Sequence, residues 1–178
     1  MDKRMNKYIG VLLILGLMSC RNSEHKGHES QDSVKKVAGT EQVVKFDDAK
    51  VQGIYDSYLD LKNFLVDTKY KEAKEASKVL SAKLGSYEGC ENTALIADKI
   101  TNAATIEEQR KQFTFLSSDV IAMFKHAEIK KGTIYVQHCP MANNGDGGDW
   151  LSSNKNIQNP YYGSEMMECG SVIEEIKN

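Results

Sequence analysis

Apolar residues recur at intervals of three and four along the middle of this chain, which is the period of an amphipathic α-helix. The first such stripe follows Asp47 and Asp48, and either carboxylate can cap a helix by accepting a backbone N–H of its first turn. The pattern predicts a helix of about five turns. Its apolar positions are Val51, Ile54, Tyr55, Tyr58, Leu61 and Leu65.

The same period predicts three more helices, over residues 69–84, 92–103 and 105–126. The last of them begins with Thr105 and Glu108 in the spacing of a capping box, where each side chain satisfies a backbone donor at the helix start. Four amphipathic helices with short connections predict an antiparallel helical bundle. The fold class is therefore expected to be mainly α.

After Gly132 the apolar residues alternate with period two, which predicts a β-strand over residues 133–138. Residues 171–176 are the only plausible partner, and the segment between them is expected to be a loop with a turn of helix around residues 159–167. An antiparallel pairing would bring Cys139 beside Cys169. We expect a small C-terminal two-stranded antiparallel ribbon that packs on the bundle, because a lone ribbon is only marginally stable.

The first nineteen residues have the pattern of an export signal. A basic start is followed by an apolar run, residues 8–18, that is too short to span a bilayer. Cys20 after Ser19 makes the segment similar to a bacterial lipobox, which implies a lipid on Cys20. We expect a signal peptide over residues 1–19, a disordered tether over residues 20–45, and one domain over residues 46–178.

These features predict a protein held by lipid to a membrane of the cell envelope, on its periplasmic face or at the surface. Removing residues 1–19 changes the net charge from −2 to −4. An acidic chain without a Lys/Arg cluster is a poor binder of nucleic acid, because binding phosphate requires positive charge. Nucleic acid is therefore excluded as a partner.

Soft sulfur donors are concentrated at one end of the predicted ribbon, where its first strand ends and its second strand begins. If Cys139 and Cys169 approach one another, methionines next to them in the sequence can share a point with the two thiols. Thiolate and thioether ligands favour Cu(I) and similar ions over calcium or magnesium. His138 would face the other side of the strand and ranks below the sulfur residues. The candidate metal ligands are Cys139, Met141, Met166, Met167, Cys169 and His138.

A disulfide between Cys139 and Cys169 is the alternative, since an exported protein can form one. The residues alone leave both interpretations open. An enzyme is not expected, because adjacent residues on a strand point to opposite faces and His138 could not activate Cys139. Cys90, in a turn between predicted helices, is expected to be incidental.

The C-terminal motifs resemble those of an uncharacterised exported bacterial family, domain of unknown function 3347. The resemblance is carried by the segments at residues 135–142, 150–152, 157–163 and 166–170. Members of that family occur as lipoproteins and at the C-terminus of membrane-fusion adaptors in copper and heavy-metal efflux. The resemblance therefore implies a metal-related role, with an efflux adaptor protein as a partner, and it favours metal binding over a purely structural disulfide. The two coexist if the disulfide is the oxidised resting form.

Overall fold

The computed structural model describes residues 42–178 of the chain. The expected signal peptide, Cys20 and most of the expected tether lie outside the described residues. Within them, the four predicted helices are confirmed and shift by only a residue or two at their ends. They are α1 (Ala49–Val66), α2 (Tyr70–Gly85), α3 (Glu91–Asn102) and α4 (Ile106–Lys125).

The prediction of a single two-stranded ribbon is wrong, because the described residues form five strands in two antiparallel sheets. The smaller sheet pairs the first two strands, and the larger one has the order β4-β3-β5 with β3 in its centre. Two short 3-10 helices, η1 (Ala142–Gly145) and η2 (Gly163–Glu165), lie in the connections. The strands are β1 (Lys45–Phe46), β2 (Ile129–Lys131), β3 (Ile134–Cys139), β4 (Gly148–Ser152) and β5 (Ser171–Ile176).

Both predicted helix caps are present. The carboxylate of Asp48 accepts hydrogen bonds from the backbone N–H groups of Lys50 and Val51, at 2.7 and 3.4 Å. At the start of α4 the Thr105 hydroxyl accepts from the N–H of Glu108 at 3.2 Å. These bonds satisfy donors that a helix cannot satisfy internally, so both helix starts are fixed by the local sequence.

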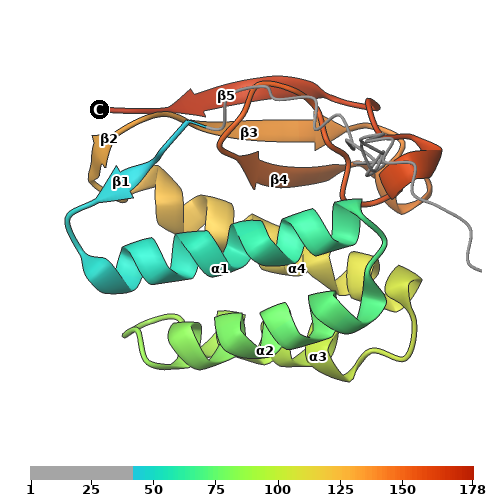
Figure 1. The fold of residues 1–178 in the computed structure, drawn as a ribbon, viewed down its shortest axis with the longest axis horizontal. Helices are drawn as coiled ribbons and strands as arrows, with labels where there is room; N and C mark the ends of the chain where they lie inside the picture. The colour runs from blue at the N-terminus through green and yellow to red at the C-terminus, as the bar shows by residue number, and fades with distance from the viewer. Residues whose placement is uncertain (1–41) are drawn as a thin grey trace, which may run out of the picture. The chain divides into compact units, whose positions relative to one another are not determined.

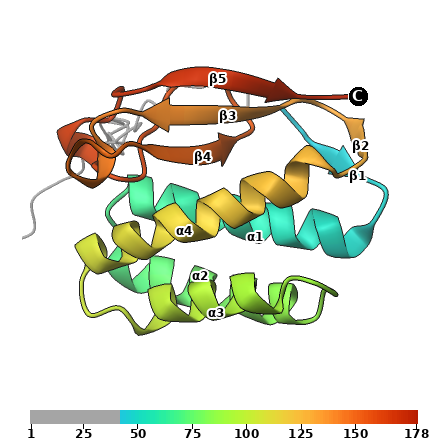
Figure 2. The same ribbon diagram turned by 180° about the vertical axis from the view of Figure 1, so that it is seen from behind.

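The elements between residues 42 and 178 are arranged in layers (Figure 1 and Figure 2). Helices α1 and α4 lie beneath the three-stranded sheet, and α2 and α3 lie on their other side. Contacts between consecutive helices join the helical layers, and α4 makes the main helical contact with β4. Val44 is already buried, so the core receives side chains from near the beginning of the described part. None of its helices combines the length and the apolarity needed to cross a membrane.

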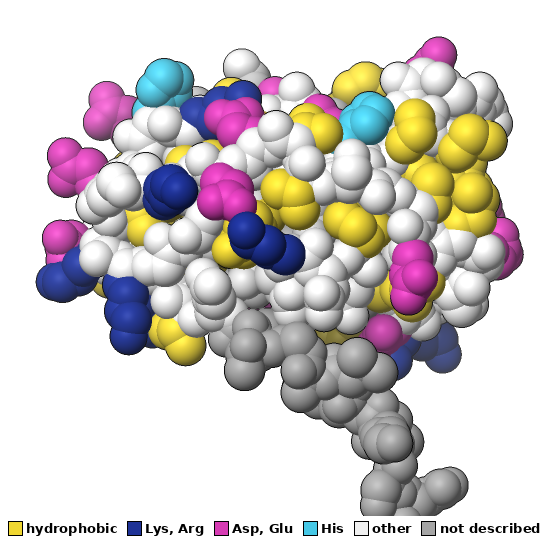
Figure 3. Space-filling view, turned by 90° about the horizontal axis from the view of Figure 1, so that it is seen from above, with side chains coloured by type: hydrophobic (Ala, Val, Ile, Leu, Met, Phe, Trp, Pro, Cys, Tyr) yellow, Lys and Arg dark blue, Asp and Glu magenta, His cyan; other side chains and the backbone are white. Residues whose placement is uncertain are grey.

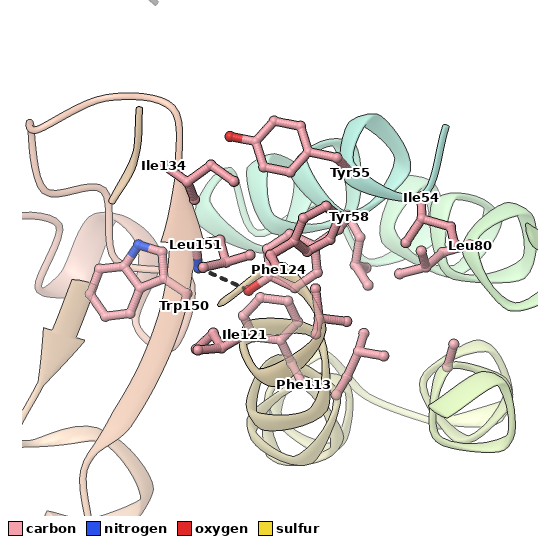
Figure 4. Packing of buried hydrophobic residues seen from close by; sticks show 14 of the residues in the cluster. Ile54, Tyr55, Tyr58, Leu80, Phe113, Ile121, Phe124, Ile134, Trp150 and Leu151 are labelled. Carbon is pink, nitrogen blue, oxygen red and sulfur yellow. Dashed lines mark hydrogen bonds between the residues drawn. The ribbon is translucent and has the colours of Figure 1, made fainter. Parts of the chain in front are cut away.

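The core joins the sheet to the helices through aromatic side chains (Figure 4). Tyr58 of α1 is fully buried and stacks on Phe113 of α4, with ring centroids 5.5 Å apart. Its hydroxyl forms a 2.7 Å hydrogen bond with Ser117 and accepts one from the N–H of Leu151 in β4 at 3.1 Å. One buried hydroxyl thus links α1, α4 and the sheet that carries the candidate site.

Candidate functional site

The structure brings Cys139 and Cys169 together, as the predicted strand pairing requires. β3 pairs antiparallel with β5 and aligns His138 with Ser171, so the end of one strand lies beside the start of the other. The two sulfur atoms are 2.9 Å apart, although thirty residues separate them in the chain. Both cysteines are free thiols.

The sulfur–sulfur distance of 2.9 Å lies between that of a disulfide and that of two sulfur ligands on one metal ion. A disulfide would shorten it to about 2.05 Å. Two sulfur ligands held at about 2.3 Å on one tetrahedral metal ion would lie about 3.8 Å apart. The observed separation of the two sulfur atoms is therefore within an ångström of both distances.

The two thiols differ in their surroundings. Cys139 is completely buried at the end of the central strand, whereas Cys169 lies in a loop and is partly exposed. The hydrogen bond with Cys139 is the main reason that the pKa of the Cys169 thiol is raised, and burial adds to it. The backbone N–H of Met141 acts in the opposite direction. The Cys169 thiol therefore holds its proton more tightly than an ordinary cysteine does.

Gly170 allows the close approach of the two cysteines. It has a φ of +144°, and a Cβ atom at this position would lie 2.6 Å from the carbonyl oxygen of His138 and 3.1 Å from the Trp150 ring. No side chain fits in that space. The glycine therefore sets how near the Cys169 segment lies to β3.

Asn159 holds the turn that carries Cys169, and sequence reasoning gave it no such role. It is fully buried, its N–H donates to the carbonyl of Met167 at 2.9 Å, and its carbonyl accepts from Gly163 at 3.0 Å. Its side-chain amide donates to the carbonyl of Cys169 at 3.0 Å. The backbone and side chain of Asn159 thus form hydrogen bonds at both ends of this turn.

The three candidate methionines lie in the segments next to the thiols. The Met166 carbonyl accepts from the N–H of Cys169 at 3.1 Å, and the Met141 carbonyl accepts from the Tyr162 hydroxyl at 2.6 Å. Met141 is 53% exposed, Met166 is 36% exposed, and Met167 is half-buried. Figure 3 shows hydrophobic side chains gathered at one end of the outer face of the sheet, the end at which η2 lies in Figure 1. The side chains of Met141 and Met166 are therefore open to solvent.

His138 is hydrogen-bonded to Asp149 on β4. Its Nδ1 lies 2.6 Å from a carboxylate oxygen of Asp149, its register partner on β4. Because neighbouring residues alternate across a strand, this pair lies on the opposite face from the Cys139 side chain. The prediction did not identify Asp149 as its partner, because β4 itself was not predicted and the sequence carries no other signal for the contact.

Arg110 of α4 is another residue whose role the sequence did not indicate. Its guanidinium donates to the carbonyl of Pro160 at 2.9 Å and to the carbonyl of Leu65 at 3.0 Å. Burial lowers the pKa of this group. The arginine fastens the segment before η2 to the end of α1, which helps to fix the loop that holds the methionines.

No three side chains of the His, Cys, Asp or Glu type within residues 42–178 are grouped so as to hold a metal ion. The soft donors near the thiol pair are the sulfur atoms of the neighbouring methionines. Such a donor set suits a soft ion that accepts low coordination, and it does not suit calcium or magnesium.

The comparison with protein families gives one match. Residues 54–132 match the model of a family described as protein of unknown function, DUF3347. The match confirms the resemblance to that family and runs from α1 to the turn after β2. It covers somewhat less than half of the chain and ends before β3, so both cysteines of the pair lie outside the matched residues. No curated protein and no solved structure matches the chain.

Proposed function

We propose that this protein binds a soft metal ion, with Cu(I) as the first choice, through the Cys139–Cys169 thiol pair. The single observation that carries the proposal is the 2.9 Å approach of two free thiols within a segment rich in methionine. Met141 and one of Met166 and Met167 would complete the coordination. The proposed role is non-catalytic.

The surroundings of the pair support exchange of an ion more than permanent storage. Cys169 lies in a loop and is partly exposed, so it can move by the ångström that a bound ion requires while Cys139 stays fixed at the end of β3. The exposed thioethers of Met141 and Met166 give an ion an open side. His138, bonded to Asp149, lies outside this first set of ligands.

The lipobox-like segment supports a lipid anchor on Cys20 at the periplasmic face or surface of the cell envelope, and the family resemblance supports buffering of copper or its transfer to an efflux adaptor. We interpret α1–α4 as an antiparallel bundle that carries the metal-binding sheet.

An anaerobic Cu(I) competition titration of the reduced full-length chain against a chromophoric chelator tests the proposal. We expect a tight equivalent that disappears in the Cys139→Ser/Cys169→Ser variant. The matched control is Ser164→Ala/Ser171→Ala, which changes two exposed residues nearby and keeps both thiols. Binding that survives the loss of both cysteines would overturn the proposal.

A second candidate function is favoured by the same distance. At 2.9 Å the thiols are closer than two ligands of one metal ion, so the pair is also placed to form a disulfide staple in a protein-interaction module. Closing a loop of about 30 residues would stabilise the fold by roughly 3.5–4 kcal/mol in the chain-entropy model. Absence of Cu(I) competition, together with thiols that resist alkylation until the purified protein is reduced, would establish the staple instead.

A further inference from the structure

The two thiols of the Cys139–Cys169 pair are not equally accessible. Cys139 is completely buried at the end of β3, the central strand of the larger sheet. Cys169 is partly exposed and lies in the connection between η2 and β5, next to the exposed Glu168. A reagent in solvent therefore meets the Cys169 side chain first, whereas the fold shields the Cys139 side chain.

The buried thiol is close enough to react at its partner. The sulfur of Cys139 lies 2.9 Å from that of Cys169, no farther than the roughly 3–3.5 Å at which reacting atoms are held in a near-attack arrangement. The hydrogen bond from the Asn159 side chain to the Cys169 carbonyl helps to hold the two segments together. Attack from such a position has a large advantage over attack by a second molecule from solution, because the groups are already brought together. An external sulfur group attached to Cys169 is therefore open to displacement by Cys139.

Cys90 has no such partner. It is half-buried, and its sulfur contact within residues 42–178 is the thioether of Met123, 4.0 Å away. A thioether cannot form a disulfide with a thiol. Cys90 is therefore an internal reference: a thiol that an external disulfide can modify and that no neighbouring thiol releases.

We propose that the pair undergoes thiol–disulfide exchange with an external disulfide, in which Cys169 reacts first and Cys139 completes the reaction. Cys169 gives its proton to solvent and attacks one sulfur of the external disulfide. A mixed disulfide forms, and the other external sulfur leaves as a thiolate that takes up a proton. Cys139 then loses its proton and attacks the Cys169 sulfur, and the second external thiolate leaves and is protonated. The pair loses two electrons, which reduce the external disulfide to two thiols.

The reverse reaction uses the same accessible sulfur. An external dithiol would attack Cys169 in the closed disulfide and release Cys139, and its second thiol would then release Cys169. A permanent staple would not open in this way. The consequence for metal binding rests on the proposed function: thiolates are the ligands, so only the reduced pair would bind Cu(I). Exchange would then regulate the metal site.

Reaction with glutathione disulfide tests the proposal in the full-length chain carrying Cys20→Ser, which removes the cysteine outside the described residues. Remaining thiols are alkylated, and the products are identified by peptide mass spectrometry. We expect the chain with both thiols to form the Cys139–Cys169 disulfide and to retain glutathione only on Cys90. In Cys139→Ser, glutathione should remain on Cys169. In Cys169→Ser, Cys139 should be modified at least about tenfold more slowly than Cys169 is in Cys139→Ser, because access limits the reaction.

Two further variants keep the test independent of folding defects. Cys139→Ala removes the buried thiol without leaving a hydroxyl in its place, and it should also retain glutathione on Cys169. Cys90→Ser is the matched control that keeps the pair, and it should form the disulfide at an unchanged rate. Equal rates of modification in Cys139→Ser and Cys169→Ser would overturn the proposal. Glutathione that persists on Cys169 while Cys139 is present, or no reaction of either residue, would also overturn it.

Cu(I) competition with the reduced and the oxidised chain separates this proposal from the proposed function. Loss of Cu(I) binding on oxidation would support regulation by exchange. A reduced chain that binds no Cu(I) would overturn the proposed function and leave the exchange reaction intact. A pair that binds Cu(I) when reduced but does not exchange with glutathione disulfide would overturn the exchange reaction and leave the proposed function intact.

Discussion

The side-chain amide of Asn159 donates a hydrogen bond to the main-chain carbonyl of Cys169, 3.0 Å away. The other end of the same side chain accepts from the N–H of Tyr161 at 2.8 Å. Asn159 and Tyr161 are both buried, so the N–H of Tyr161 has no water as a substitute for this partner. The position of the Cys169 thiol beside Cys139 therefore depends on an asparagine ten residues away in the sequence.

Asn159→Ala is expected to destabilise the protein by about 1–3 kcal/mol, because it leaves a buried N–H and a carbonyl without partners. Urea unfolding of the reduced protein measures the loss. Asn156→Ala, in the same segment but exposed, should change stability by no more than about 0.5 kcal/mol. Formation of the Cys139–Cys169 disulfide by a mild oxidant should also slow in Asn159→Ala. Equal stability of the two variants would contradict this role.

Gly170→Ala is expected to destabilise the fold for two reasons: a steric clash of the new side chain, and strain in a backbone with positive φ. The new Cβ would lie 2.6 Å from the carbonyl oxygen of His138, and that oxygen belongs to a central strand that cannot move easily. Gly145→Ala separates the two causes, because Gly145 also has a positive φ, +99°, but nothing lies within 4 Å of its Cβ position. Thermal unfolding of both variants should show the larger loss for Gly170→Ala, by at least about 1 kcal/mol. A loss no greater than that of Gly145→Ala would mean that the contact with His138 is unimportant.

The helices were predictable because their signals are local. α1 begins at a side-chain cap and carries a continuous apolar stripe, and both features are independent of the remainder of the chain. β4 had no such signal. Gly148 and Asp149 disfavour a strand, and the consecutive Trp150 and Leu151 are both buried, so the alternation that marks a half-exposed strand is absent.

In the candidate site, too, some contacts could be predicted from the sequence and others could not. The approach of Cys139 and Cys169 follows from pairing two recognisable strands, and the sequence was enough to predict it. The bond between His138 and Asp149 requires β4, and the bond between Asn159 and Cys169 requires a folded irregular loop. Contacts of this kind depend on the tertiary structure, and no periodic pattern in the sequence signals them.

Tyr58→Phe is expected to cost about 1–3 kcal/mol, although it removes only one oxygen atom. The loss leaves the buried N–H of Leu151 and the hydroxyl of Ser117 without this partner. Tyr87→Phe, at a half-buried position, is the matched control and should have a much smaller effect. Urea unfolding measures both. Because Leu151 is in β4, hydrogen exchange in the sheet should accelerate in Tyr58→Phe and not in the control; unchanged exchange would show that the hydroxyl does not hold the sheet.

The stability of the reduced protein should fall as the pH rises above neutrality. The pKa of the Cys169 thiol is raised in the folded state, chiefly by its hydrogen bond with Cys139. The folded protein therefore binds this proton more tightly than the unfolded chain does. The protonated Cys169 thiol contributes its full share of the folding stability below the unfolded pKa of about 8.5. This stability is lost as the pH rises toward the raised pKa of the folded state.

Urea unfolding under reducing conditions between about pH 7.5 and 9.5 measures this loss, in a range below the ordinary pKa of tyrosine. The Cys139→Ser/Cys169→Ser variant has no thiol to titrate at this position, so its stability should depend less on pH. The pKa of Cys90 is also raised, mainly by burial, and Cys90→Ser isolates that share. If the double variant and the wild-type chain lose stability in parallel across this range, the coupling between Cys139 and Cys169 does not stabilise the folded protein.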